Sequence, residues 1–387
     1  MKRVPLERIA LWSLFGFVGA LQVSIAAAQV LFTVVLVCWA ALLATGRARL
    51  TAPPFFRPLL VYAVLTLVAT VFSVDPLTSL IDDKQLFLLL AVPATYEIAR
   101  GGQARTVVGV IIGVGAASAA FGIIQYGVLH YNHLGQRPQG SMGHYMTYSG
   151  LLMLVATAAV ARVLFEKRNR VWPALVLPAL LVALALTFTR SAWVGASVGI
   201  AALLLLKDFR LVGALPVVLA IGIALAPPQV TQRFYSMFSL NDPTSRDRVA
   251  MIREGIRMIG ADPLTGMGPN MVEREYVRFR DPEAVERVNP HLHDVPMQIA
   301  AERGLPALAA WCWFVGSAAA GLWSLLRRGR HPFLAAAGLG ALAAMLAAGL
   351  FEHNFGDSEF LMLLLVMLTL PFASERAERT GSVETAV

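Results

Sequence analysis

The hydrophobic positions of the chain form a succession of long apolar segments separated by short polar connections. Most of these segments have roughly 17 to 25 residues, the length with which an α-helix crosses a bilayer. The pattern therefore predicts an all-α, polytopic membrane protein with about twelve transmembrane helices. The predicted spans are residues 9–27, 29–46, 58–74, 85–99, 106–129, 144–164, 171–188, 191–206, 211–226, 294–325, 333–351 and 357–373.

One long segment between the ninth and tenth spans interrupts this pattern. Four apolar residues from Val249 to Ile259 recur there at helical spacing, which predicts an amphipathic helix of about fifteen residues, suited to a headgroup interface. Its expected start is the hydroxyl pair Thr244-Ser245, and its expected end is Gly260. A turn at 263–269 and a second, charged helix at 271–279 are expected to follow.

These patterns divide the chain into four parts. Residues 1–226 hold spans one to nine, residues 227–293 form an external helical loop, residues 294–373 hold the last three spans, and residues 374–387 form a tail. The tenth span is long for one helix, so it is expected to begin outside the membrane.

The composition agrees with a membrane protein, because 57% of the residues are hydrophobic and only 14% are charged, whereas a soluble domain has about 25% charged residues. The net charge of +8 would suit a protein that binds nucleic acid. However, more than half of the 32 Lys and Arg residues lie in alternate short connections and near the termini. The positive-inside rule associates such a distribution with the cytoplasm. We therefore predict two cytoplasmic termini, an external loop, membrane lipids as surroundings and no nucleic-acid partner.

Arg190 stands alone between two apolar runs, at the external end of the predicted hairpin. A guanidinium in hydrocarbon is costly, so an arginine at this place is a candidate functional residue. The alternative is a snorkelling anchor, whose charged head stays in water while its stem covers apolar surface. The other unusual polar residues of the same face include Lys84, His130, His133, Arg137, His144, Glu352, His353 and Asp357.

The sequence indicates neither a metal site nor a cofactor. His130 and His133 are three residues apart, but glycines and a proline follow them, so a loop is expected rather than a helix that presents both rings. Cys38 and Cys312 each lie inside an apolar run and are expected to act as small packing residues.

Three stretches of sequence on the predicted external face resemble motifs of one family. They are residues 187–195 around Arg190, residues 245–252 around Arg248 with the turn 262–268 after them, and His293-Asp294 followed by Gln298, Glu302, Gly304 and Leu305. In this order they resemble the O-antigen ligase and polymerase superfamily of bacterial envelope enzymes. The topology, with a large external loop late in the chain, is similar as well.

The resemblance has two departures. The family often has Asn, Ser or Gln after the motif histidine, where this chain has Asp294. An acid there would raise the basicity of a neighbouring imidazole. The alternative is that the acid faces away from the imidazole. His291 precedes His293 by two residues, which leaves open which histidine is functional, although the spacing to Gly304 favours His293. The choice of Arg248 over Arg246 rests on the apolar residues that follow.

The resemblance implies a metal-independent, inverting glycosyltransferase without a cofactor, active at the periplasmic face of the bacterial inner membrane. Its donor would be a glycan on undecaprenyl pyrophosphate, and its acceptor a sugar hydroxyl of the lipid A core. Arg190 and Arg248 would neutralise the leaving pyrophosphate, because a guanidinium is permanently charged and bidentate toward phosphate. His293 would act as the base. The further substrate-binding candidates are Lys84, Arg137, Arg246 and His353.

Several alternatives stay open at this point. Arg248 would otherwise be a solvated loop residue, and His293 a polar helix cap. An O-antigen polymerase or a protein O-oligosaccharyltransferase would use the same donor with another acceptor. A polysaccharide transporter or flippase belongs to a different class, for which charges near the midplane and a repeat between halves are expected; the sequence has neither.

Overall fold

The computed structural model describes residues 6–239, 242–328 and 331–384, with side chains up to residue 376. Its regular elements are helices, and the described residues contain no strand, only one isolated bridge. The prediction of an all-α fold is thus confirmed. Up to the long loop, the elements are α1 (Leu6–Ala20), α2 (Ile25–Ala44), α3 (Phe56–Val71), α4 (Pro76–Asp82), the 3-10 helix η1 (Asp83–Leu90), α5 (Ala91–Ile98), α6 (Gly102–Gly127), α7 (Tyr145–Phe165), α8 (Val171–Leu186), α9 (Arg190–Lys207), η2 (Phe209–Gly213) and α10 (Ala214–Leu225).

The second part of the chain begins with short helices and ends with long ones. The elements are α11 (Pro228–Tyr235), η3 (Ser236–Phe238), α12 (Pro243–Ala261), α13 (Val272–Phe279), α14 (Val295–Arg328), α15 (Pro332–Gly349), η4 (Asn354–Gly356) and α16 (Ser358–Glu384). The tail predicted at 374–387 is therefore helical as far as Glu384. Residues 385–387 and the first five residues, predicted to be cytoplasmic, lie outside the described residues.

The described residues include seven helices long and apolar enough to cross a membrane, namely α2, α6, α7, α9, α14, α15 and α16. Three shorter apolar helices, α3, α8 and the η2–α10 pair, accompany them. All twelve predicted spans fall on helical segments, but the fourth divides into η1 and α5 and the first is shortened to α1. The chain is a membrane protein with several apolar helices, and twelve crossings stay a prediction.

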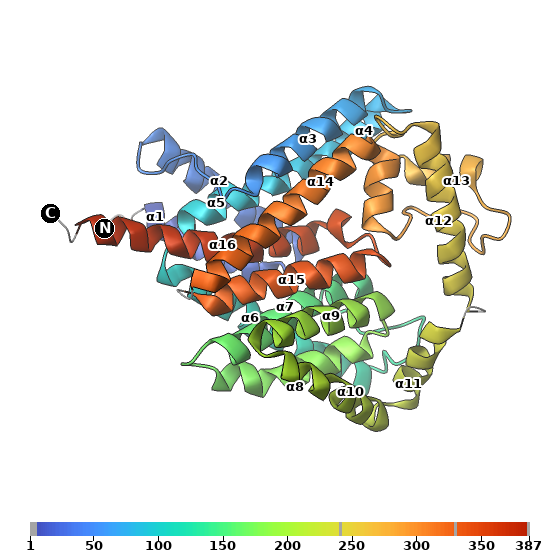
Figure 1. Cartoon of the computed structure of the whole chain (residues 1–387). Helices are drawn as coiled ribbons and strands as arrows, with labels where there is room; N and C mark the ends of the chain where they lie inside the picture. Colours follow the sequence, from blue (N-terminus) through green and yellow to red (C-terminus); the bar gives the residue numbers. More distant parts are fainter. Residues whose placement is uncertain (1–5, 240–241, 329–330, 385–387) are drawn as a thin grey trace.

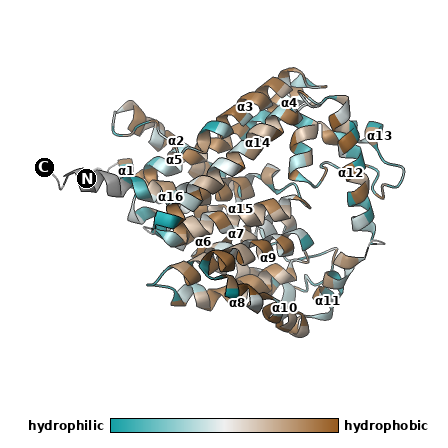
Figure 2. Cartoon of the chain, in the orientation of Figure 1, coloured by the Kyte–Doolittle hydropathy of each residue, from teal (hydrophilic) through white to brown (hydrophobic). Residues whose placement is uncertain are grey.

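The two ends of the helix bundle differ. The start of α1 and the end of α16 lie at one end of the bundle, whereas α11, α12 and α13 lie across the opposite end (Figure 1). The segment with α12 and α13 carries more hydrophilic residues than the bundle (Figure 2). This arrangement fits the predicted sidedness. The compartment that each end faces remains a prediction.

Close helix packing holds α9, and therefore Arg190 at its first position, in place. A Cβ at Gly195 would lie 2.7 Å from the Ala344 carbonyl oxygen, and one at Gly199 would lie 2.8 Å from that of Gly340. The two glycines thus let the backbones of α9 and α15 approach closely, as small residues do between membrane helices.

Helix α12 has the predicted position but a different cap, and its apolar side chains are exposed. Asp242, rather than a hydroxyl, caps it: its Oδ1 accepts hydrogen bonds from the backbone N of Thr244 at 3.1 Å and of Ser245 at 3.3 Å. The apolar side chains of Val249, Ile252 and Ile256 are exposed. The residues buried instead are Asp247, Ala250, Met251, Glu254, Gly255 and Met258.

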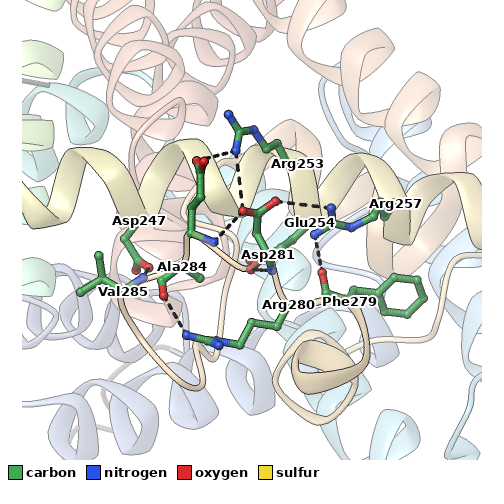
Figure 3. A network of polar contacts seen from close by, with 10 residues as sticks. Asp247, Arg253, Glu254, Arg257, Phe279, Arg280, Asp281, Ala284 and Val285 are labelled. Atoms are coloured by element: carbon green, nitrogen blue, oxygen red, sulfur yellow. Dashed lines mark hydrogen bonds and ion pairs between the residues drawn. The ribbon is translucent and has the colours of Figure 1, made fainter. Parts of the chain in front are cut away.

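The buried acids of α12 hold the loop that follows α13 (Figure 3). Glu254 Oε1 accepts from the backbone N of Asp281 at 2.7 Å, and Asp247 Oδ1 accepts from the N of Val285 at 3.0 Å. The Asp281 carboxylate forms ion pairs with Arg253 at 3.6 Å and Arg257 at 3.4 Å. These long-range contacts explain why charged residues of α12 face inward and leave its apolar side chains exposed.

The predicted turn at 263–269 docks on a kink in α14. Gly304 has φ 78° and ψ 167° and breaks the helix, and Pro306 has no N–H for the Glu302 carbonyl four residues earlier. The backbone N of Gly268 donates to that carbonyl at 2.9 Å, and the N of Leu305 donates to the Pro263 oxygen at 2.8 Å. The kink therefore joins the long loop before α14 to the tenth predicted span.

Candidate functional site

Arg190 is buried beneath the segment that leads into α12. Its side chain is 8% exposed. Its Nη1 donates to the Ser236 carbonyl oxygen at 3.1 Å, and its Nη2 donates to Asp242 Oδ1 at 3.0 Å. A snorkelling anchor would keep its charged head in water, so this geometry favours a functional arginine over that alternative.

Arg190 belongs to a cluster of four arginines, which we define as Arg137, Arg190, Arg233 and Arg248. Burial, followed by the charges of Arg190 and Arg137, lowers the pKa of Arg233 to about 10, although Asp242 opposes the shift. Arg248 contributes to the same lowering. The cluster thus brings together four positive charges from α9, α11, α12 and the connection before α7.

The sequence predicted three members of the cluster and missed Arg233. This residue lies in the short helix α11, and its Nε donates to the Phe188 carbonyl oxygen at 3.4 Å. Nothing in the local pattern distinguishes it from a solvated loop arginine. Only the fold of α11 against the outer end of α9 places it in the cluster.

Arg137 and Arg248 each rest on an aromatic ring. The Arg137 guanidinium carbon lies 4.1 Å from the ring centre of Tyr145, and that of Arg248 lies 5.6 Å from the ring centre of Phe351. Burial lowers the pKa of Arg248, with Arg190 adding to the effect and Glu352 opposing it. Arg248 is therefore half-buried near a carboxylate and not a freely solvated loop residue.

His293 pairs with a carboxylate from the connection between α15 and α16. Its Nδ1 lies 3.1 Å from Glu352 Oε1. Burial alone would raise the pKa of Glu352, but the hydrogen bond and charge of His293 and the charge of Arg248 outweigh it and lower this pKa. Asp294 is not the partner of the imidazole, because its Oδ1 accepts from the backbone N of Met297 at 2.8 Å at the start of α14. The expectation that Asp294 acts on the histidine is wrong, and its alternative, an acid that faces away, holds.

His291 and His353 face each other beside this pair. Their ring centres lie 4.8 Å apart. Burial lowers the pKa of both imidazoles, so both are neutral near pH 7. Within the described chain, His291 Nδ1 is buried without a hydrogen-bond partner, whereas His293 has Glu352. The geometry therefore favours His293 as the functional histidine.

A cavity of about 310 Å³ adjoins His293. It lies between the first turns of α7 and α9, the residues before α14, and the connection from α15 to α16. Of the described residues that line it, none is an arginine. The polar residues of its wall are His144, Thr147, Ser149, Thr189, Ser191, His291, His293, Glu352, His353, Asn354 and Asp357.

Two predicted substrate-binding residues lie outside this assembly. Lys84 is exposed on η1, and Arg246 is exposed on α12. Neither side chain makes a hydrogen bond or an ion pair with another described residue. Residues two apart point to different sides of a helix, which explains why Arg248 reaches the cluster while Arg246 does not. Their roles in binding stay predictions.

The arrangement can neutralise an anion and move a proton. The described residues contain no group of three or more His, Cys, Asp and Glu side chains that could hold a metal ion. Positive charge is instead supplied by the four arginines, and the His293–Glu352 pair offers a base with a fixed orientation.

Comparison with known families agrees with the resemblance seen in the sequence. A family model described as O-Antigen ligase matches residues 174–312. The match runs from α8 into α14 and contains Arg190, Arg233, Arg248 and His293. No curated protein matches the chain.

Proposed function

We propose that the chain transfers a glycan from undecaprenyl pyrophosphate to a sugar hydroxyl of the lipid A core, because the family model that matches residues 174–312 is described as O-Antigen ligase. The superfamily implies a glycosyltransferase-type enzyme of O-antigen or lipopolysaccharide assembly, with a lipid-linked glycan and a lipid acceptor. The reaction that we propose is metal-independent, inverts the anomeric carbon, and takes place at the periplasmic face of the bacterial inner membrane.

The single observation that carries this proposal is the arginine cluster beside the His293–Glu352 pair. Breaking the bond between C1 of the sugar and the pyrophosphate builds negative charge on the leaving oxygens. The four guanidinium groups outnumber the two carboxylates, Asp242 and Glu352, that offset their charge among the described residues, so the cluster retains positive charge for such an anion. Charge that is already oriented in a partly buried site is typically the largest catalytic contribution.

His293 supplies the complementary step. Its Nδ1 is engaged by Glu352, which leaves Nε2 to accept the proton of the acceptor hydroxyl. As the hydroxyl oxygen bonds to C1, the bond from C1 to the pyrophosphate oxygen breaks. The pyrophosphate takes the bonding electron pair, and the proton passes to the imidazole. Attack from the face opposite the leaving group inverts C1.

The test is a reconstitution of the purified chain with a lipid-linked glycan donor and lipid A–core, in the presence of a chelator. Wild type should produce a ladder of glycan-bearing lipid A–core. Arg190→Ala, Arg248→Ala and His293→Ala should lower its rate by at least about 10²-fold. Arg278→Ala, which removes an exposed arginine of α13, is the matched control and should retain the wild-type rate.

Other results of this reconstitution would identify a different activity or refute the proposed site. Product that stays on the lipid carrier would identify a polymerase, and glycosylated protein would identify an oligosaccharyltransferase. Movement of the glycan lipid across the bilayer without a new bond would identify a transporter. Full activity of Arg190→Ala and His293→Ala would refute the site, and inhibition by the chelator would refute metal independence.

A further inference from the structure

The wall of the cavity beside His293 carries an unusual amount of unused hydrogen-bonding capacity. Four residues of this wall each hold one buried polar atom without a partner in the described part of the chain. These atoms are Nδ1 of His291, Nδ1 of His353, Oε2 of Glu352 and Oδ1 of Asn354. Buried polar groups nearly always have a partner, so a concentration of unpaired ones around a single cavity indicates a place where a polar ligand completes the bonding.

The position of the cavity separates it from the anion site. Its wall includes Thr189 and Ser191, the two neighbours of Arg190, but no described arginine. Arg190 itself points toward Ser236 and Asp242. The cavity therefore adjoins the arginine cluster on the side of His293, where an incoming hydroxyl has to approach if the pyrophosphate leaves on the opposite side.

The chemistry of the wall suits a sugar ring better than a phosphate. A neutral imidazole offers one donor and one acceptor, and the carboxylate of Glu352 offers acceptors alone. Met146, Met153 and Phe360 supply apolar surface. Its volume of about 310 Å³ is near the lower end of small-molecule sites, which have roughly 300–1,000 Å³, and fits a single ring rather than an oligosaccharide.

We propose that this cavity is the subsite for the terminal sugar ring of the acceptor. His353 and Asn354 bind hydroxyls of that ring and position its reactive hydroxyl for His293. The inference rests on the proposed transfer reaction and goes beyond it, because it assigns the acceptor to a cavity and makes His353 a positioning residue for acceptor recognition.

Gly356 offers a second way to test the placement of His353. A Cβ added at Gly356 would lie 2.0 Å from His353 Nε2. The close approach of this backbone fixes the imidazole against η4. Gly356→Ala therefore displaces the ring from the cavity wall and leaves its chemistry unchanged.

The experiment separates recognition of the acceptor from recognition of the donor. Initial rates are measured against lipid A–core at saturating donor, and against donor at saturating lipid A–core. His353→Phe and Gly356→Ala should each raise the acceptor KM at least about tenfold, with the donor KM changed less than about twofold. His353→Gln, which restores a donor and an acceptor, should recover most of the loss. His133→Phe, in the exposed loop before α7, is the matched control and should leave both KM values unchanged.

Binding of the acceptor sugar is also measured without any reaction. Saturation-transfer NMR with free, de-acylated core oligosaccharide should show binding to wild type and to Arg190→Ala, and loss of binding in His353→Phe. A thermal unfolding curve for each variant verifies that it is folded. If His353→Phe does not fold, Gly356→Ala takes its place as the variant expected to lose binding, and His353→Gln should retain it.

The results that overturn the inference are specific. A rise in the donor KM with an unchanged acceptor KM would place the donor sugar in the cavity. Unchanged KM values in all His353 and Gly356 variants would show that the cavity is not an acceptor subsite. Failure of the wild-type protein to bind the oligosaccharide would show the same. If wild type binds the oligosaccharide but transfers no glycan, the proposed function fails and the subsite stands.

Discussion

Asp242 Oδ1 accepts a hydrogen bond from Arg190 Nη2 at 3.0 Å, and the same oxygen caps helix α12. One carboxylate thus joins the first residue of α9 in the bundle to the first turn of α12 in the long loop. Arg248 lies in the next turn of α12, on its half-buried side. The two arginines of the proposed leaving-group site are therefore held relative to each other through Asp242.

Asp242→Ala should weaken both the helix and the site. Loss of a helix cap costs about 1 kcal/mol, and Arg190 loses its counter-ion. We expect faster hydrogen exchange in α12, and a transfer rate reduced at least about tenfold, since Arg190 and Arg248 lose their fixed separation. Asp208→Ala removes a cap of the same kind at η2 and should change neither quantity. Equal effects of the two substitutions would contradict the coupling.

Arg233 should contribute to donor affinity although it belongs to no recognised motif. Arg233→Gln should weaken binding of the lipid-linked donor by roughly 10- to 100-fold, the equivalent of one charged hydrogen bond. Equilibrium binding to the purified protein measures this, with Arg278→Gln as the control. An unchanged dissociation constant would show that Arg233 does not contribute to donor binding.

The sequence identified residues that contrast with their surroundings and missed those that depend on long-range contacts. Arg190 was selected because it interrupts two apolar runs, and His293 because it begins a stretch that resembles a family motif. Asp242 was overlooked as a cap because Thr244 and Ser245, which follow it, are equally suitable residue types. Arg233 reaches the cluster only through the packing of α11.

The inward face of α12 could not be predicted from the sequence for a similar reason. The apolar side chains of Val249, Ile252 and Ile256 are exposed. Asp247 and Glu254 are buried instead, since backbone N–H groups 38 and 27 residues later bind their carboxylates. No pattern in the sequence near these two acids indicates such distant partners. The exposed apolar side chains remain available for a membrane interface, as the sequence predicts.

Glu352→Gln should slow the chemical step more than it weakens substrate binding. The amide keeps the shape of the side chain but removes the negative charge that stabilises His293 once it has taken a proton. We expect kcat to fall between about 10-fold and 10²-fold, a part of the roughly 10²–10⁴-fold that a general base supplies, with acceptor KM changed less. Single-turnover rates measure this, and Glu286→Gln, at an exposed loop position, is the control.

Glu352 should also make the stability of the fold depend on pH. The pKa of Glu352 is lowered from its ordinary 4.5, so the folded state favours the carboxylate. Its contribution to stability is complete above the ordinary pKa and is lost as the pH falls through the lowered value. Unfolding temperatures measured from about pH 7 downward should decline more for wild type than for Glu352→Gln. Parallel curves would show that the carboxylate gains nothing from His293.

Gly304→Ala should weaken the contact between the turn at 263–269 and α14, because the backbone conformation of Gly304 is almost exclusive to glycine. With φ 78° and ψ 167°, an added Cβ would also lie 2.2 Å from the Leu264 carbonyl oxygen. Backbone strain of this kind costs about 1–3 kcal/mol, and the clash forces the turn at 263–269 away from the Glu302 carbonyl. Thermal unfolding and limited proteolysis of the loop should both report the change. Gly316→Ala lies in the same helix, where an added Cβ has no neighbour within 4 Å, and should be neutral or slightly stabilising. If Gly304→Ala is as stable as Gly316→Ala and its loop resists protease equally, the kink is not what holds the loop on the bundle.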